Sequence, residues 1–399
     1  MISVQAARAA CLALVQPLPP ETVSLETAGG RVLASDVIAQ RDQPPFAAAA
    51  MDGYAMRLAD RARGAQLQVV GEAPAGRAWQ GRVGPGQAVR IFTGAPLPEG
   101  ADCVVIQEDV TRMQDRITLG AMLEPGDNIR PAGGDFRAGD RLAAPRRLTP
   151  ADIALCAAMN APRLAVARRP EVALIATGDE LVSPGEAPRP DQIVASNTYG
   201  LKAMITAAGG HARILPIARD NRDSLTQVFE LAAGADLIVT IGGASVGDHD
   251  LVGRVAAELG MAQAFYKVAM RPGKPLMAGR IGNVPMLGLP GNPVSAMVCG
   301  MIFMLPMLRA MQGLPPEEDR YPLARLGCDV PPTGPRTHYM RAQITHGADY
   351  PVITPFGSQD SARLSLLSGA TALLVRPAGD GPRSAGALVE HIPLGTSYP

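Results

Sequence analysis

The stretch LIVTIGG, residues 237–243, decides the fold. Four of its first five residues are apolar, as in a strand buried on both faces, and two glycines mark a turn directly after it. Similar apolar runs lie nearby at 172–176 and 214–218, and they alternate with segments of helical periodicity at 197–208, 225–232 and 252–259. This alternation predicts a doubly wound parallel sheet in a domain spanning 169–318.

The segments on either side of this domain have a different pattern of apolar residues and turns. Between 44 and 141, short apolar runs alternate with glycine- and proline-rich turns, which predicts a β module. Residues 319–399 return to short β-type runs, which predicts a small C-terminal β domain. Helical patterns after Ser3 and Thr149 predict a helical and linker domain made of 1–43 plus 142–168. The sequence thus predicts an α/β multidomain protein with β-rich flanks.

Composition excludes several classes of protein. The 399 residues carry 37 basic and 37 acidic side chains, so no basic excess exists to bind a nucleic acid or an anionic membrane. The five cysteines form no C-x-x-C pair, which argues against a disulfide framework or a cysteine-based zinc site. No signal peptide is recognised, and the apolar stretch 294–308 is shorter than a membrane span. We therefore expect a cytoplasmic protein without nucleic-acid or membrane partners.

Acidic residues follow the predicted strands one after another. Glu180 follows the first strand, Asp220 the second and Asp250 the third. Because the carboxyl ends of parallel strands share one edge of a sheet, these carboxylates are expected to converge there. Each could simply be a helix cap. Three acids at one edge would instead suit a divalent cation, which prefers oxygen ligands.

Features that suit anions lie in the same domain. The glycine run 242–247 lets backbone N–H groups approach a phosphate, although as a bare pattern it is weak. The loop 267–274 carries three cations, and GLPGNP at 288–293 leads into the apolar segment. Asn292 and Pro293 suit the start of a helix, whose N–H groups can bind an anion or can simply be capped. In the β module, Asp52 stands alone in an apolar stretch and could be only a turn residue.

Six strings in this order resemble one known family. They are MDGYA at 51–55, FTGAPLPEGAD at 92–102, TGDEL at 177–181, GGASVGDHD at 242–250, RPGKP at 271–275 and GLPGNPVS at 288–295. Together they resemble the MoeA family of molybdopterin molybdenumtransferases, which is also similar to the C-terminal domain of gephyrin. The resemblance covers nearly the whole chain.

The resemblance implies an activity. A family member is expected to be a magnesium-dependent transferase that cleaves the phosphoanhydride of adenylylated molybdopterin, releases AMP and inserts molybdenum from molybdate. It also implies a homodimer whose cleft combines the molybdopterin-binding doubly wound domain of one subunit with the β module of the other. Molybdopterin adenylyltransferase and molybdoenzyme apoproteins are the protein partners it implies.

The resemblance also assigns residues by motif. The catalytic positions it implies are Asp52, Thr93, Asp135, Glu180, Asp220 and Asp250. The last three are also the metal positions. The resemblance matches Lys267, Arg271, Lys274, Pro290, Pro293, Ser295, Arg341 and Ser365 to positions that bind substrate, and the anion-binding features described above add Gly242, Gly243, Ser245, Gly247, Gly291 and Asn292.

The chain departs from the family pattern at three places. Four alanines, 47–50, replace polar residues that could brace Asp52, Arg271 stands where lysine is common, and paired serines are reduced to Ser365.

Two other functions fit part of the pattern. A molybdopterin adenylyltransferase uses a similar doubly wound domain but does not need the long flanks, and a gephyrin-like scaffold would not require a sheet edge rich in acids and bases.

Overall fold

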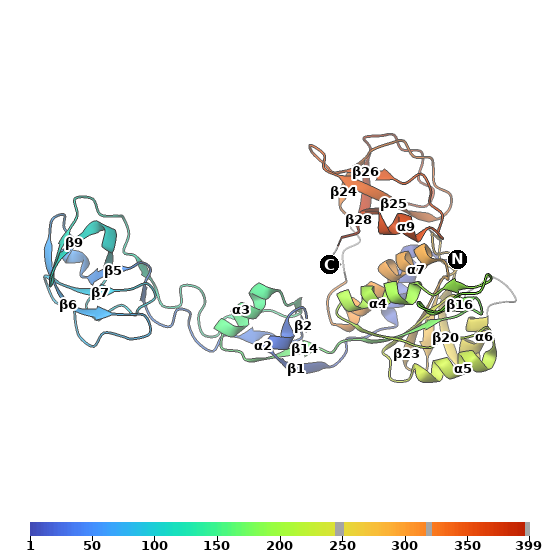
Figure 1. The fold of residues 1–399 in the computed structure, drawn as a ribbon, viewed down its shortest axis with the longest axis horizontal. Helices are drawn as coiled ribbons and strands as arrows, with labels where there is room; N and C mark the ends of the chain where they lie inside the picture. Colours follow the sequence, from blue (N-terminus) through green and yellow to red (C-terminus); the bar gives the residue numbers. More distant parts are fainter. Residues whose placement is uncertain (244–250, 317–320, 396–399) are drawn as a thin grey trace. The chain divides into compact units, whose positions relative to one another are not determined.

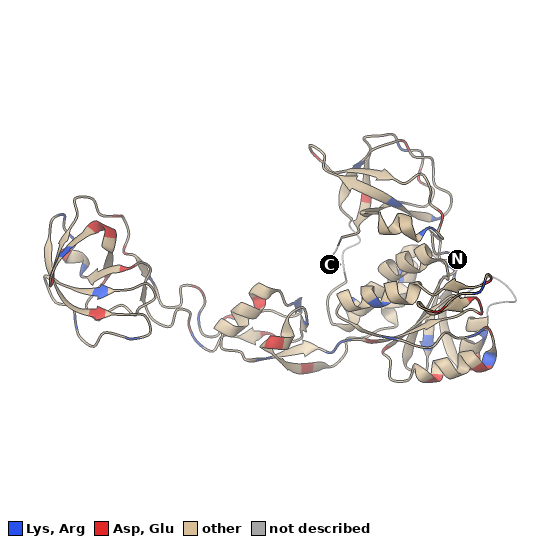
Figure 2. Ribbon diagram, viewed as in Figure 1, with Lys and Arg blue, Asp and Glu red and all other residues tan. Residues whose placement is uncertain are grey.

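The computed structural model describes residues 1–243, 251–316 and 321–395 (Figure 1). The chain forms two compact units, which are described separately. The sheet unit consists of Met1–Glu21, Gly30–Ala34 and Val166–Pro399, and the module unit of Thr22–Gly29 and Ser35–Ala165. The chain passes between them within the short strands β1 (Pro20–Ser24) and β14 (Arg163–Ala167) and on either side of β2 (Val32–Leu33). Charged residues of both signs are interspersed on both units, as Figure 2 shows.

A six-stranded sheet organises the sheet unit. In spatial order its strands are β18 (His211–Ile214), β15 (Glu171–Ala176), β19 (Leu237–Ile241), β23 (Val284–Leu289), β22 (Met277–Ile281) and β20 (Met261–Tyr266). The pairs β18–β15, β15–β19 and β19–β23 are parallel, which confirms the predicted fold class. The sheet is nevertheless mixed, because β22 runs antiparallel to both of its neighbours. A two-residue turn joins β22 to β23, and so tight a turn permits only antiparallel pairing.

Alternate residues of the central strands face two different helical layers. Leu174 and Val239 point into a core shared with α1 (Val4–Ala13), α4 (Asn197–Ala207) and the long apolar helix. Ala173 and Ile238 point into a second core with α5 (Arg222–Leu231) and α6 (Leu251–Glu258). Figure 1 shows these two helical layers on opposite faces of the sheet. Both faces are therefore buried, which explains the nearly continuous apolar composition of the strands.

The predicted strand at 214–218 is misplaced. The observed strand β18 ends at Ile214, and beyond it only an isolated bridge joins Ala218 to Thr177. Pro216 has no backbone N–H, so it interrupts the ladder at this point. The strand predicted at 237–241 and the helix predicted at 197–208 are confirmed to within one residue at each end.

The long apolar helix exceeds its predicted length. It runs over Pro293–Met311 as α7 (Pro293–Cys299), a π-helical segment (Gly300–Met304) and α8 (Leu305–Met311). Its 19 residues, with a mean hydropathy of 1.8, are long and apolar enough to cross a membrane, so the predicted length was too short. Because 67% of the most apolar stretch is buried inside the protein, we interpret it as a core helix.

The C-terminal β domain closes into a small barrel. Strand β25 (Thr337–Thr345) pairs with both β26 (Val352–Pro355) and β27 (Ala372–Arg376). The ring is completed by β24 (Leu323–Leu326) and β28 (Leu388–Pro393). On the outside, β21 (Met270–Arg271) adds in parallel to β25, which connects the barrel to the preceding domain.

The module unit contains the predicted β module. Its sheet, in spatial order, consists of β8 (Cys103–Ile106), β5 (Gly53–Met56), β7 (Gln87–Ile91), β6 (Gln66–Ala73), β10 (Arg116–Leu119) and β9 (Val110–Met113). Helix α3 (Pro150–Ala158) begins where the sequence predicts it. Thr149 Oγ1 accepts from the Asp152 N–H at 3.2 Å, and Asp152 Oδ2 accepts from the Thr149 N–H at 2.8 Å. This reciprocal pair is a capping box.

Candidate functional site

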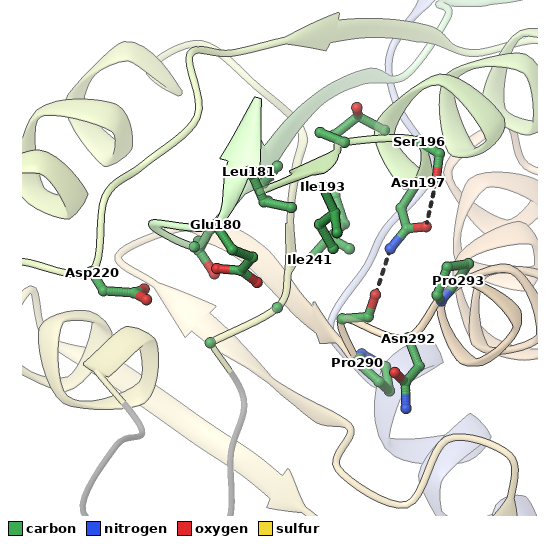
Figure 3. A pocket seen from close by; sticks show the side chains of 18 of the residues that line it. Glu180, Leu181, Ile193, Ser196, Asn197, Asp220, Ile241, Pro290, Asn292 and Pro293 are labelled. Carbon is green, nitrogen blue, oxygen red and sulfur yellow. Dashed lines mark hydrogen bonds between the residues drawn. The ribbon is translucent and has the colours of Figure 1, made fainter. Parts of the chain in front are cut away.

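A cavity of about 890 Å³ opens at the carboxyl edge of the parallel strands. The turns that follow β15, β18, β19 and β23 all contribute to its wall. This is where ligands bind in doubly wound sheets, because the strand-to-helix turns emerge on that edge. An apolar part of the wall consists of Leu181, Ile193 and Ile241, between the acidic side and the start of α7 (Figure 3).

Two of the predicted acids lie on the same side of this cavity. Glu180 follows β15 and Asp220 follows β18, and both line the wall (Figure 3). Within residues 1–243, 251–316 and 321–395, neither carboxylate accepts a hydrogen bond or forms an ion pair. Both acids are therefore available to a ligand, unlike capping residues.

Two residues that sequence analysis did not single out hold these acids in place. Arg219 Nη1 donates to the carbonyl oxygens of Gly178, Asp179 and Leu181, at 3.4, 3.1 and 3.1 Å. Asp179 Oδ1 accepts from the Asp220 N–H at 3.1 Å. Arg219 and Asp179 thus tie the two acid-bearing turns together. Both stand next to a predicted acid in the sequence, but nothing there distinguishes a brace from a ligand.

The predicted third acid cannot be placed. Asp250, with Ser245 and Gly247, lies outside the described residues. Among the residues that are described, no group of three histidine, cysteine, aspartate or glutamate side chains could hold a metal ion. The metal prediction therefore rests on Glu180 and Asp220 alone.

The glycines after β19 have a conformational reason. Gly242 and Gly243 line the cavity with φ of +92° and +66°, in the region that favours glycine. A β-carbon at Gly242 would lie 2.8 Å from the Thr177 carbonyl oxygen, and one at Gly243 would overlap the Val252 side chain. The Thr177 hydroxyl is buried beside them and has no hydrogen-bond partner among the described residues. Backbone and hydroxyl together offer polar atoms to a ligand here.

The predicted cations separate into two groups. Lys274 lines the cavity, whereas Lys267 and Arg271 do not. Lys267 Nζ lies 4.9 Å from the Tyr266 ring centroid, and Arg271 is exposed on β21, in register with His338 of the barrel. Burial and the neighbouring arginines, Arg271 first among them, lower the pKa of His338 to about 4. Arg271 therefore lies near His338, which Arg336, Arg376 and Arg341 also approach.

The start of α7 lines the cavity, but part of it is already occupied. The Pro290, Gly291, Asn292 and Pro293 segment contributes to the wall, whereas Ser295 is buried behind it. The Val294 N–H donates to the Ser361 carbonyl at 3.1 Å, and Asn292 Nδ2 donates to Ser361 Oγ at 3.1 Å. Asn292 occupies the N-cap position with Pro293 directly after it, as predicted, but its side chain makes no cap bond. Asn197 Nδ2 instead holds the turn by donating to the Gly291 carbonyl at 2.7 Å (Figure 3).

Neither predicted residue of the C-terminal domain lines the cavity, although Ala362 of that domain does. Arg341 is only 1% exposed, and its guanidinium donates to the carbonyl oxygens of Ser358, Asp360 and Arg363 at 3.3, 2.8 and 3.2 Å. These contacts brace the loop 356–363 and use the donors of Arg341, so Arg341 is not open to substrate as the resemblance implied. Ser365 is exposed in α9 (Leu364–Ser368) and is not part of the wall.

Three predicted catalytic residues belong to the module unit. Thr93 donates to Asp52 Oδ1 through both its N–H and its hydroxyl, each at 2.7 Å. These two bonds lower the pKa of Asp52 because they favour the ionised carboxylate. Arg90 stacks beside this pair, 4.8 Å from the Phe92 ring centroid. Asp135 is exposed in the same unit.

The alanine segment 47–50 is held by its backbone. Ala48 and Ala49 form β4, which pairs with β11 (Ile129–Arg130). The Ala49 N–H donates to the Ala95 carbonyl at 3.0 Å, and the Ala50 N–H donates to the Asn128 carbonyl at 2.8 Å. Main-chain hydrogen bonds therefore hold this segment without polar side chains.

Comparisons with known proteins agree with this architecture. Residues 2–160 match the family model for the MoeA N-terminal region (domain I and II), 173–310 match a probable molybdopterin binding domain, and 323–394 match the MoeA C-terminal region (domain IV). A molybdopterin molybdenumtransferase of Nostoc sp. is 37% identical over 389 residues, which cover 94% of this chain and 89% of that protein. The one from Bacillus subtilis is 32% identical over 381 residues, which cover 93% and 89%.

A solved structure gives the same result for the fold. The molybdopterin biosynthesis MoeA protein from Pyrococcus horikosii superposes with a TM-score of 0.83 at 30% sequence identity, covering 98% of both chains. Sequence relatives, family models and the fold thus agree over nearly the full length. The chain belongs to the MoeA family.

Proposed function

We propose that this protein is a molybdopterin molybdenumtransferase, which inserts molybdenum from molybdate into adenylylated molybdopterin and releases AMP. The observation that carries the proposal is the charge of the cavity. The acids Glu180 and Asp220 and the cation Lys274 line one cavity, and no ion pair joins them in the described parts of the chain. Opposite charges left unpaired suit a substrate that brings both phosphate and a metal ion.

Magnesium fits the acidic side of the cavity. Glu180 and Asp220 offer carboxylate oxygens that have no partner among the described residues, and such oxygens are the ligands that Mg²⁺ prefers. We propose that these two residues hold the ion and that Asp250 completes the set. When bound, the ion would offset the negative charge of the phosphate oxygens.

Other residues of the cavity wall suit the phosphates. Gly242 and Gly243 present backbone close to a ligand without an intervening β-carbon. Lys274 adds a positive charge, and the Pro290–Pro293 turn shapes the wall beside it. We propose that these groups orient the phosphoanhydride and stabilise the charge that develops as it breaks. The half-buried Lys267 and the exposed Arg271 are proposed to attract molybdate toward the site.

The finer assignments extend beyond one unit. We propose a cytoplasmic homodimer in which a second subunit supplies Asp52, Thr93 and Asp135. Thr93 keeps Asp52 ionised, which suits a residue that contacts a cation or a water molecule. A molybdopterin adenylyltransferase is the proposed source of the substrate, and apoproteins of molybdoenzymes are the proposed recipients of the product.

A reconstituted reaction tests the proposal. Purified protein is incubated with adenylylated molybdopterin, molybdate and Mg²⁺, and nucleotides are separated by chromatography. We expect AMP release that depends on both molybdate and Mg²⁺. Accumulation of adenylylated molybdopterin from ATP and molybdopterin would instead identify an adenylyltransferase. A dimer with neither activity would favour a scaffold.

A further inference from the structure

Arg254 is a cavity-lining cation that the family motifs do not include. It is the fourth residue of α6 and lines the cavity together with Leu251, which lies three residues earlier on the same helix face. The other face of α6 buries Val252, Val255 and Ala256 in the core. Because that packing fixes the rotation of the helix, the fold itself directs Arg254 to the cavity.

Arg254 does not use the partner that its helix provides. Glu258 lies four residues later, at the spacing where an acid and a base pair on a helix. Glu258 Oε2 instead accepts a 2.7 Å hydrogen bond from Arg222 Nε of α5. Over the three described ranges, no hydrogen bond or ion pair involves the Arg254 guanidinium. Its donors therefore remain available to a ligand.

The cavity holds two cations of different chemistry. Lys274 offers a point charge on a flexible stem, whereas the planar guanidinium of Arg254 offers paired donors that match two oxygens of one phosphate. Neither is neutralised by Glu180 or Asp220 among the described residues. A ligand that satisfied only Lys274 would leave Arg254 unused.

We infer that Arg254 binds phosphate oxygens of the substrate from the α6 wall and so selects phosphorylated ligands. The inference rests on the proposed function for the nature of that substrate, a pterin joined to AMP through a phosphoanhydride. It adds a specificity-determining residue that stands outside the six motifs.

Binding measurements with single-residue variants test this inference. Isothermal titration calorimetry with AMP and with inorganic pyrophosphate compares wild type, Arg254→Ala and Arg254→Lys. Arg169→Ala is the matched control, because Arg169 is an exposed arginine of the same unit that does not line the cavity. We expect Arg254→Ala to weaken both affinities about 10- to 100-fold, the usual range for a hydrogen bond to a charged group. Arg254→Lys should lose less, and Arg169→Ala should stay within about twofold of wild type.

Several outcomes would overturn the inference. These are equal effects of Arg254→Ala and Arg169→Ala, full affinity in Arg254→Ala, or a wild-type protein that binds neither anion. The lysine variant keeps the test valid if the alanine variant folds poorly. If the wild type binds pyrophosphate through Arg254 but releases no AMP in the reconstituted reaction, the proposed function fails and the inference stands.

Discussion

Exchanging Asp220 for asparagine separates a site role from a structural role. The Asp220 carboxylate accepts no hydrogen bond from the described residues, and the exchange keeps its size. We therefore expect the free energy of unfolding to change by no more than about 0.5 kcal/mol. The rate of AMP release should nevertheless fall about 10²- to 10³-fold, the usual loss when one electrostatic group of a site is removed.

Asp236 provides the control for this exchange within the same unit. Asp236 accepts from Arg168 Nη1 and Nη2 at 2.9 and 2.7 Å and from the Glu171 N–H at 2.8 Å. Asp236→Asn breaks part of this charged network, so it should cost about 2 kcal/mol of stability. Because Asp236 does not line the cavity, the variant should keep most of its activity wherever it remains folded.

Two measurements on both variants decide whether Asp220 acts in the site or stabilises the fold. Thermal unfolding followed by circular dichroism gives the stability difference, and chromatography of AMP gives the rate. The reasoning is refuted if Asp220→Asn unfolds as early as Asp236→Asn, since Asp220 would then be structural. It is also refuted if Asp220→Asn releases AMP at the wild-type rate when Mg²⁺ is limiting.

Three further changes follow from the same geometry. Gly243→Ala places a β-carbon on a residue of positive φ and against the Val252 side chain, so pyrophosphate affinity measured by calorimetry should fall at least tenfold. Unchanged affinity would exclude phosphate binding by the backbone of Gly242 and Gly243. Thr93→Val removes one of the hydrogen bonds that lower the pKa of Asp52, so a carboxyl NMR titration should show that pKa rising toward its ordinary value, and an unchanged titration would refute the assignment. Because the pKa of Asp52 is lower in the folded protein, ionised Asp52 stabilises the fold above the unfolded-state pKa, and this stabilisation is lost as the pH falls through the folded-state pKa. Thr149→Ala breaks the capping box of α3 and should cost about 1 kcal/mol in thermal unfolding, whereas an unchanged midpoint would show that the cap contributes nothing.

Local signals in the sequence were sufficient for most of the elements. The strand Leu237–Ile241 is apolar because both of its faces are buried, and α3 begins directly after Thr149 because its cap is encoded within four residues. Long-range pairing was not predicted. The closure of β25 on β27 and the parallel addition of β21 to β25 join segments far apart in the chain. Pro216 did carry a local signal, a missing N–H, which would have shortened the second predicted strand.

The site residues also differ in whether local sequence was enough to predict them. Glu180 and Asp220 could be predicted because a strand end fixes where the next residues emerge. Arg254 could not, because only the packing of α6 determines which of its faces meets the cavity. Arg341 carries a charge that suggests an anion contact, and only the fold shows that its donors are already used by the 356–363 loop. Sequence thus places charges along the chain, while packing decides which of them remain available.

A crystal structure with AMP and Mn²⁺ would test the central claim most directly. Manganese substitutes for magnesium at oxygen sites and is located by its anomalous scattering. The account predicts a manganese peak bound by the Glu180 and Asp220 carboxylates, with the AMP phosphate against Gly242, Gly243 and Lys274. An ordered manganese and nucleotide bound elsewhere, with the 890 Å³ cavity holding only water, would contradict it.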